Sequence, residues 1–258
     1  MTIKKDACAE KKVALVTGSS SGIGRATAIE FARHGYDVII DYWTDILTGE
    51  FDTKGAAEVK AELEQKYHVK TMVFRVDVSN EKSVKAMIEK IGAKYGHIDV
   101  LVNNAGTVYD RPYTEATVKE FHRVLDVDVM GAFLVTREAV RYMKKGSCIV
   151  NVSSNAGTKE NNPDSPDYNI AKIGLQSLTR SFAFQFKPNI RVNAVAPGWV
   201  DTKFNYGLDE AYVKSETDRI WLNRWAQPEE IANVIYFLCS DKASFINGEI
   251  ISIDGGYQ

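Results

Sequence analysis

The sequence predicts a single α/β domain of the doubly wound type, with about seven parallel strands in one sheet and helices on both faces. Short apolar runs rich in β-branched residues alternate with helical stretches about seven times along the 258 residues. That alternation is typical of a parallel sheet covered on both sides. The stretches richest in glycine, asparagine and serine come directly after four of these strands. Parallel sheets of this kind bind ligands at the carboxyl ends of their strands, so these stretches predict one shared site.

Composition excludes several other classes of protein. The 32 basic and 34 acidic residues leave a net charge of −2, which favours neither nucleic acid nor an anionic membrane as a partner. No apolar run reaches the ~18 residues that span a bilayer, and residues 1–12 lack the apolar core of a signal peptide. The three cysteines and four histidines show no paired spacing, so neither a disulfide framework nor a metal site is expected. We therefore expect a cytoplasmic protein of one domain, residues 1–258, in which residues 1–12 form a flexible arm.

The first expected strand, Val13–Val16, leads into a glycine-rich turn. The turn Gly18-Ser19-Ser20-Ser21-Gly22-Ile23-Gly24 precedes a helical pattern that runs to Gly35. Glycines between a strand and a helix let the backbone approach a ligand closely and leave free N–H groups for a phosphate. The turn lacks the Gly-Lys-Ser/Thr of a P-loop and the spacing of a strict G-x-G-x-x-G motif. The alternative is a turn that serves only tight packing.

Signals for the later elements follow in chain order. The remaining expected strands are residues 38–40, 71–76, 99–102, 148–152, 191–195 and 249–253, with a helix over residues 54–67. Ser79 is expected to cap the next helix and Gly96 to end it. Thr117 and Glu120 form a capping box that opens a long helix. Pro228 stands in the first turn of a late helix.

A tyrosine and a lysine in the stretch Tyr168-Asn169-Ile170-Ala171-Lys172 indicate acid–base chemistry. On a helix, side chains four residues apart lie on one face, about one turn from each other. An ammonium close to a phenol favours the phenolate and lowers the pKa of a phenol from ~10, and a shift of roughly 3 units allows proton transfer near neutral pH. Taken alone, such a pair is also common on a solvated helix face.

The chain resembles the short-chain dehydrogenase/reductase family along nearly its whole length. The motifs that carry the resemblance are Thr17-Gly18-x-x-x-Gly22-Ile23-Gly24, Asp77-Val78, Asn103-Asn104-Ala105-Gly106, Ser153-Ser154, Tyr168-x-x-x-Lys172, Pro197-Gly198, and Gly248 with Asp254-Gly255-Gly256. The last of these is similar to the β-ketoacyl carrier-protein reductase-like members. The resemblance implies a Rossmann-type fold, NAD or NADP as cofactor, and interconversion of a ketone and a secondary alcohol.

The resemblance also implies roles for particular residues. Tyr168 is expected to act as general acid or base, Ser154 to hydrogen-bond the reacting oxygen, and Lys172 to bind the nicotinamide ribose and polarise the tyrosine. Ser153 is the other serine at this strand end, but alternation along a strand turns it to the opposite face. The expected cofactor-binding residues are Gly18, Ser20, Ser21, Gly22, Ile23, Gly24, Asp41, Tyr42, Asp77, Val78, Asn104, Ala105, Gly106, Tyr168, Lys172, Pro197, Gly198, Val200 and Thr202.

One catalytic position differs from the family pattern. The family carries an asparagine in a context similar to Asp-Val-Asn-x-x-Gly, and Asp128 stands in its place. In the family this residue supports a water that leads to the lysine, partly through its backbone carbonyl. A carboxylate there can pair with Lys172 through water and weaken the effect of the lysine on Tyr168. We therefore expect reduced or pH-shifted activity; the alternative is that Asp128 only shapes its helix.

The choice between NAD and NADP depends on residues after the second strand. NAD-dependent members carry an acid there that binds the ribose 2′-hydroxyl and repels a 2′-phosphate. Counted from Gly35, Tyr42 occupies that position and Asp41 precedes it. With Asp41 and Asp45 close by and no local arginine or lysine, a phosphate is disfavoured, so the sequence leans to NAD. An insertion at residues 46–52 is expected to reshape this pocket.

The sequence leaves the substrate open between several classes. Residues 199–227 form the segment that closes over substrate in the family, and their six aromatic side chains suit an apolar or ring substrate; packing within or between subunits is the alternative. The polar residues 158–167 are a second candidate wall.

The favoured activity is that of a 3-oxoacyl-(carrier protein) reductase acting on an acyl thioester. A sugar, polyol or other small-alcohol dehydrogenase is the alternative among enzymes. A non-catalytic nucleotide-binding sensor or scaffold is the alternative from another class. The resemblance further implies a small-molecule carbonyl or alcohol substrate and a homotetramer.

Overall fold

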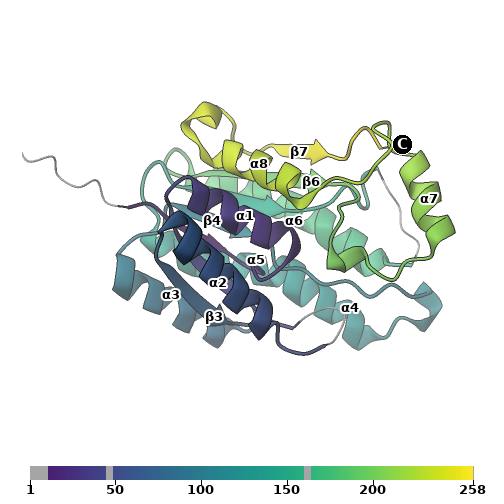
Figure 1. Cartoon of the computed structure of the whole chain (residues 1–258), viewed down its shortest axis with the longest axis horizontal. Helices are drawn as coiled ribbons and strands as arrows, with labels where there is room; N and C mark the ends of the chain where they lie inside the picture. The colour runs from purple at the N-terminus through teal and green to yellow at the C-terminus, as the bar shows by residue number, and fades with distance from the viewer. Residues whose placement is uncertain (1–10, 45–48, 160–163, 258) are drawn as a thin grey trace, which may run out of the picture.

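The computed structural model describes residues 11–44, 49–159 and 164–257, and in them seven parallel strands form one sheet (Figure 1). The strands are β1 (Val13–Val16), β2 (Asp37–Tyr42), β3 (Thr71–Arg75), β4 (Val100–Asn103), β5 (Cys148–Val152), β6 (Arg191–Pro197) and β7 (Ile250–Ile253). Their order across the sheet is β3-β2-β1-β4-β5-β6-β7. This is the predicted doubly wound fold, and its strand order reverses between β1 and β4.

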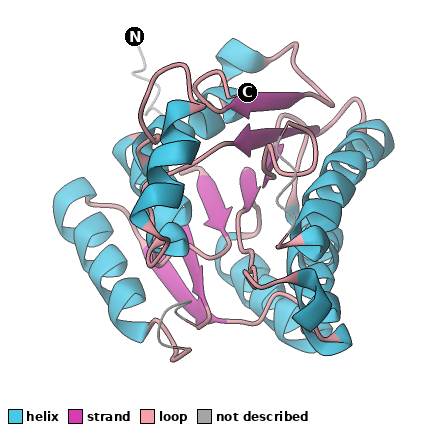
Figure 2. Ribbon diagram, turned by 90° about the vertical axis from the view of Figure 1, so that its right-hand side faces the viewer, coloured by secondary structure: helices cyan, strands magenta, loops and turns pink. Residues whose placement is uncertain are grey.

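Helices cover both faces of the sheet (Figure 2). They are α1 (Gly22–Arg33), α2 (Thr53–Tyr67), α3 (Glu81–Tyr95), α4 (Val118–Leu125), α5 (Ala132–Ala139), α6 (Pro166–Phe186), α7 (Glu210–Asp218) and α8 (Pro228–Cys239). Strand β1 is fully buried and shows why helices are needed on both faces of the sheet. Ala14 and Val16 pack into one apolar cluster with residues of α1, α2 and α8, whereas Val13 and Leu15 pack into another with residues of α3, α5 and α6. A strand that is apolar on both faces requires helices on both.

Most of the expected helix ends are confirmed. Thr117 and Glu120 form the capping box at the start of α4, Gly96 ends α3 with a φ of 72°, and Pro228 is the first residue of α8. Ser79 was the wrong cap for α3. Its hydroxyl donates to Asp77 at 2.6 Å, and Asn80 caps the helix instead by accepting from the amide of Ser83.

The long helix expected after Thr117 is interrupted. A π-helical turn over Asp126–Gly131 separates α4 from α5. A Cβ on Gly131 would lie 2.6 Å from the side chain of Val78, so a glycine lets this turn pass close to the residues that follow β3. π-Helical turns inside α-helices are frequent at functional sites. Here the turn carries Asp128, which is 1% exposed.

Parts of three expectations lie outside the described residues. They are the arm at residues 1–12, of which residues 11 and 12 are described, the insertion at 46–52 together with Asp45, and residues 160–163 of the second candidate wall. None of the helices in the described part of the chain is long and apolar enough to cross a bilayer.

Candidate active site

A cavity of about 600 Å³ opens at the carboxyl ends of the strands, beside the point where the strand order reverses. The residues from the sequence analysis that line it are Gly18, Ser20, Ser21, Gly22, Ile23, Asp41, Asp77, Val78, Asn104, Ala105, Gly106, Ser154, Tyr168, Lys172, Pro197, Gly198, Val200 and Thr202. Gly24, Tyr42 and Asp128 lie outside this lining. The tertiary structure thus brings nearly all the expected residues to one place.

The glycine turn forms one side of the cavity. Gly18 and Gly22 have φ angles of 62° and 53°, which only glycine adopts without strain. Gly24 serves packing, because a Cβ there would lie 2.2 Å from the carbonyl oxygen of Gly18. Asn104 secures the turn from β4 by donating to the carbonyls of Thr17 and Gly18 at 2.9 and 3.1 Å.

The N-terminus of α1 fits a phosphate group. Helix α1 begins at Gly22, and its N-cap residue Ser21 makes no side-chain capping bond within the described structure. The first-turn amides therefore keep their donor capacity, and the helix dipole favours an anion at this end. Both residues line the cavity, so the turn suits the pyrophosphate of a dinucleotide.

Asp41 and Tyr42 at the end of β2 point to opposite sides. Asp41 is 1% exposed, lines the cavity, and accepts from the amide of Gly18 at 3.3 Å through Oδ2. Its Oδ1 is buried and has no hydrogen-bond partner among the described residues. Burial raises the pKa of Asp41 to about 7, against the hydrogen bonds from backbone amides that lower it. Tyr42, expected to face the cofactor ribose, packs on the apolar cluster on the other face of β2 because successive strand residues alternate.

Asp77 and Val78, which are the expected adenine contacts, line the cavity. Asp77 pairs with Arg123 at 2.8 Å and accepts from Ser79. Burial raises the pKa of Asp77, but the hydrogen bonds from Ser79 and Arg123 outweigh it and hold the pKa below its usual range. Arg123 also lines the cavity, although no sequence motif indicated it. It comes from α4, 46 residues away from its partner.

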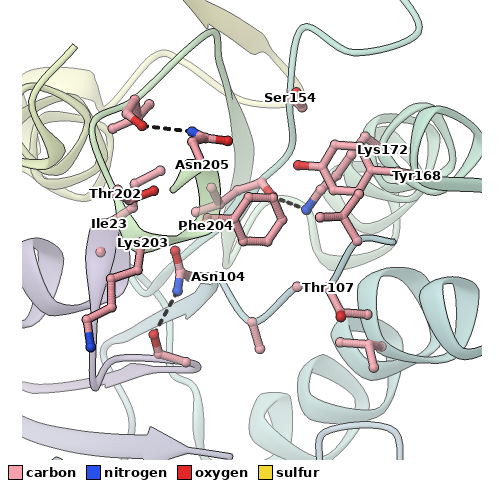
Figure 3. A pocket seen from close by; sticks show the side chains of 18 of the residues that line it. Ile23, Asn104, Thr107, Ser154, Tyr168, Lys172, Thr202, Lys203, Phe204 and Asn205 are labelled. Carbon is pink, nitrogen blue, oxygen red and sulfur yellow. Dashed lines mark hydrogen bonds between the residues drawn. The ribbon is translucent and has the colours of Figure 1, made fainter. Parts of the chain in front are cut away.

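Both serines after β5 line the cavity, but their hydroxyl groups have different partners. The hydroxyl of Ser153 donates to the carbonyl of Lys172 at 2.9 Å, and Ser153 is 3% exposed. Ser154 is half-buried, and Figure 3 places it on the cavity beside Tyr168 and Lys172. Its Oγ accepts from the amide of Ala156 at 3.0 Å, so its own proton is available to a substrate oxygen.

Lys172 lies between Tyr168 and Asp128. Its ammonium is 5.2 Å from the centroid of the Tyr168 ring and 3.0 Å from Oδ2 of Asp128. The contact with Asp128 is direct, whereas the sequence suggested pairing through water. Oδ1 of Asp128 accepts from the amide of Thr107 at 2.8 Å, which ties the π-helical turn to the loop after β4.

The Lys172–Asp128 pair is removed from solvent, with exposures of 4% and 1%. Burial raises the pKa of Asp128, and Lys172 opposes this shift. Burial lowers the pKa of Lys172, but the charges of Asp128 and Tyr168 outweigh it and leave the pKa above its usual value. Lys172 is therefore an ammonium at neutral pH, and the negative charge of Asp128 offsets part of its electrostatic effect on Tyr168.

A second buried ion pair holds the start of α6. Arg111 meets Asp167 at 3.0 Å, and the side chain of Asp167 is fully buried. The other carboxylate oxygen of Asp167 accepts from the amide of Tyr168 at 3.0 Å. Arg111 thereby fixes the residue next to the tyrosine, across 56 positions of sequence. No pattern in the sequence indicated this pair.

The segment 199–227 supplies the far wall of the cavity. Trp199, Phe204 and Tyr212 line it, and the ring centroid of Phe204 is 6.1 Å from that of Tyr168. Figure 3 shows Phe204 between the tyrosine and the side of the cavity that carries Ile23. Other aromatic residues of the segment point away, and Tyr206 and Trp221 are 56% and 69% exposed.

The position of the cavity defines the class of protein. A doubly wound sheet that opens at its switch point beside a tyrosine and a lysine is typical of an oxidoreductase that uses a nicotinamide nucleotide. A family model described as enoyl-(acyl carrier protein) reductase matches residues 18–258. The chain belongs to the short-chain dehydrogenase/reductase family.

Individual relatives cover almost the whole chain. It is 38% identical to 3-oxoacyl-[acyl-carrier-protein] reductase FabG of Thermotoga maritima, over 96% of this chain and 98% of the relative. It is 40% identical to cis-4-hydroxycyclohexanecarboxylate dehydrogenase of Sinomonas cyclohexanicum, over 96% of both chains. A short-chain dehydrogenase of Burkholderia cenocepacia, solved in complex with NADP, superimposes with a TM-score of 0.88 at 28% identity, over 95% of this chain and 97% of the other.

Proposed function

We propose that this oxidoreductase reduces a 3-oxoacyl thioester to the 3-hydroxyacyl thioester. One observation carries the reaction class: Ser154, Tyr168 and Lys172 line the same cavity as the glycine turn. A bound nicotinamide nucleotide supplies the hydride. The protein has two tasks, which are to hold the carbonyl group and to provide one proton.

Each residue of the cluster has a separate part in this scheme. The available proton of Ser154 binds the carbonyl oxygen and stabilises the negative charge that develops on it. Tyr168 gives its phenolic proton to that oxygen, and takes it back in the oxidation direction. Lys172 stabilises the resulting phenolate by its charge. Asp128 limits this stabilisation, because it holds the ammonium at 3.0 Å from the opposite side.

We propose NAD as the preferred cofactor. The carboxylate of Asp41 lies against the glycine turn with one buried oxygen that no described residue satisfies. A 2′-phosphate placed near this group would meet a like charge when Asp41 is ionised. Arg123, an arginine of the cavity lining, is already paired with Asp77 at 2.8 Å. The Burkholderia cenocepacia relative was solved in complex with NADP. A preference of this protein for NADPH over NADH would therefore contradict the proposal.

The thioester substrate is supported by the relatives and by the apolar part of the cavity lining. Two of the relatives named as 3-oxoacyl-[acyl-carrier-protein] reductases are 38% and 39% identical over almost the whole chain. The apolar side chains of Trp199 and Phe204 in the cavity lining suit an acyl chain.

A cyclic secondary alcohol is the second candidate substrate. The aromatic wall of Trp199, Phe204 and Tyr212 offers flat apolar surfaces to a ring. The relative named as a hydroxycyclohexanecarboxylate dehydrogenase, at 40% identity, points the same way.

A substrate panel tests the proposal. Acetoacetyl thioesters, cyclohexanols and polyols are followed at the nicotinamide absorbance with NADH and NADPH in turn. Tyr168→Phe is expected to lower kcat at least ~100-fold, since it removes the proton donor, with cofactor affinity within about threefold. Tyr113→Phe, at a side chain that is 67% exposed, is the control. Tight cofactor binding without turnover of any substrate would instead support the sensor or scaffold.

A further inference from the structure

The far wall of the cavity is attached to the C-terminal end of the chain through one buried carboxylate. Glu216 of α7 is 6% exposed. It accepts from the indole N–H of Trp199 at 3.1 Å and from the hydroxyl of Tyr257. Arg219 completes the group with an ion pair at 3.0 Å. These four residues are referred to below as the Glu216 cluster.

We propose that Glu216 and Tyr257 are positioning residues that hold the substrate wall closed and so set the affinity for the carbonyl substrate. This inference rests on the proposed function, because it concerns the substrate side of the same cavity. Neither residue lines the cavity. They act through Trp199, which does.

Trp199 transmits the restraint to the wall. It stacks on Trp225 with ring centroids 5.2 Å apart and meets the ring of Tyr212 edge-on at 5.9 Å. Tyr212 lies on the same helix as Glu216, one turn earlier, and also lines the cavity. The indole therefore has its ring held by aromatic contacts and its N–H held by Glu216, and a single orientation satisfies both.

Residues 254–257, called the C-terminal strip, are joined to the wall segment, residues 199–227, by backbone contacts. Tyr257, which is 4% exposed, forms a β-bridge with Ile220, and the amide of Leu222 donates to the carbonyl of Gly255 at 3.2 Å. The guanidinium of Arg219 lies 4.4 Å from the centroid of the Tyr257 ring. Figure 1 shows the C-terminal end of the chain beside α7. The strip follows β7, so the sheet itself is the support to which the wall is attached.

The physical consequence follows from burial of the carboxylate. A buried charge is stable only while its hydrogen-bond donors are present. Tyr257→Phe removes one donor but keeps the ring and its contact with Arg219, so the strip retains its place while the wall loses a restraint. Glu216→Gln keeps an acceptor for one donor and removes the charge. The restraint on the wall in Glu216→Gln is therefore expected to be weaker than in the wild type and stronger than in Glu216→Ala.

Limited proteolysis of the full chain measures the closed state without any substrate. Trypsin sites lie within the wall segment at Lys203, Lys214, Arg219 and Arg224. A hydrogen bond to a buried charge is worth enough to change the open population about 10-fold or more. Tyr257→Phe is therefore expected to be cut in this segment about 10 times faster than the wild type. Tyr206→Phe is the matched control, because it makes the same change in the same segment at a side chain that is 56% exposed.

Steady-state kinetics measure the effect on the substrate. We expect KM for the carbonyl substrate to rise about 3- to 10-fold in Tyr257→Phe and Glu216→Gln, since the binding-competent state is less populated. KM for the cofactor should stay within about twofold, because neither Glu216 nor Tyr257 lines the cavity that the glycine turn borders.

Equal cleavage rates and equal KM values in Tyr257→Phe and Tyr206→Phe would overturn the inference. A wild-type protein that turns over no carbonyl compound would overturn the proposed function alone. The cleavage rates would then still decide for or against the Glu216 cluster.

Discussion

Replacing Asp128 with asparagine removes a buried negative charge 3.0 Å from the Lys172 ammonium while the size of the side chain is kept. The asparagine Oδ1 still accepts from the amide of Thr107, so the π-helical turn keeps its attachment to the loop after β4. The substitution therefore changes the field at Tyr168 and also removes the ion pair with Lys172, because the amide nitrogen that replaces Oδ2 cannot accept from the ammonium.

The distances around Lys172 set the size of the effect. The Lys172 ammonium is 3.0 Å from the Asp128 carboxylate and 5.2 Å from the centroid of the Tyr168 ring, so the carboxylate lies within about 8 Å of that ring. At an effective dielectric constant of ~20, a charge at ~8 Å changes the energy of a second charge by about 2 kcal/mol. Water in the open cavity reduces this to between about 1 and 2 kcal/mol, or roughly one pH unit.

The direction follows from the sign of the charge. A carboxylate near the phenol disfavours the phenolate, so its removal favours it. In the oxidation direction the phenolate is the base, and the rising limb of kcat/KM against pH should move about one unit to lower pH in Asp128→Asn. In the reduction direction the falling limb should move the same way.

The assay is kcat/KM for one substrate pair from pH 5 to 10, in both directions, at constant ionic strength. Glu230→Gln is the control, since Glu230 forms an exposed ion pair with Arg224 and neither residue lines the cavity. Limbs that coincide for the wild type and Asp128→Asn would refute the reasoning and show that Asp128 only shapes its turn. A shift to higher pH would refute it as well.

Three further substitutions test other parts of the site. Asp41→Asn removes a group whose burial raises its pKa from 3.8 to about 7. Through this group the free energy of unfolding of the wild type falls by up to about 4 kcal/mol between pH 4 and pH 7. The variant should therefore be more thermally stable than the wild type at pH 8 but not at pH 4, and it should accept NADPH better. Asp167→Asn should lower kcat about 10-fold with KM for the cofactor unchanged, because Arg111 loses its charged partner beside Tyr168; equal kcat values would contradict this role. Gly24→Ala places a Cβ 2.2 Å from the carbonyl of Gly18 and should weaken cofactor binding more than ~10-fold in a fluorescence titration, whereas Gly174→Ala, with its nearest contact at 3.6 Å, should leave it unchanged.

Local patterns in the sequence determined much of this protein. The strands were found from short apolar runs, and the capping box of Thr117 and Glu120 from residues three positions apart. Alternation along β5 predicted different directions for the hydroxyls of Ser153 and Ser154, and their hydrogen-bond partners differ. These features depend on neighbours within a turn of helix or a few strand residues, and backbone geometry fixes such relations before any long-range contact forms.

The prediction of a helix cap at Ser79 was wrong, and the side chain of Tyr42 packs on the core and does not line the cavity. Ser79 is a residue type that commonly caps helices, but the carboxylate of Asp77 accepts from its hydroxyl. Tyr42 stands at the family position for the ribose contact, yet β2 extends through it and turns it toward the core. Successive strand residues point to opposite faces, so Asp41 lines the cavity and Tyr42 does not.

The tertiary structure alone decided which distant residues meet. Arg111 reaches Asp167 across 56 positions, Arg123 reaches Asp77 across 46, and Tyr257 reaches Glu216 across 41. None of these pairs carries a motif, because each depends on how several helices and strands are placed together. The Lys172–Asp128 contact also belongs here: the sequence showed an unusual aspartate, and only the inward turn of residues 126–131 made its contact with the lysine direct.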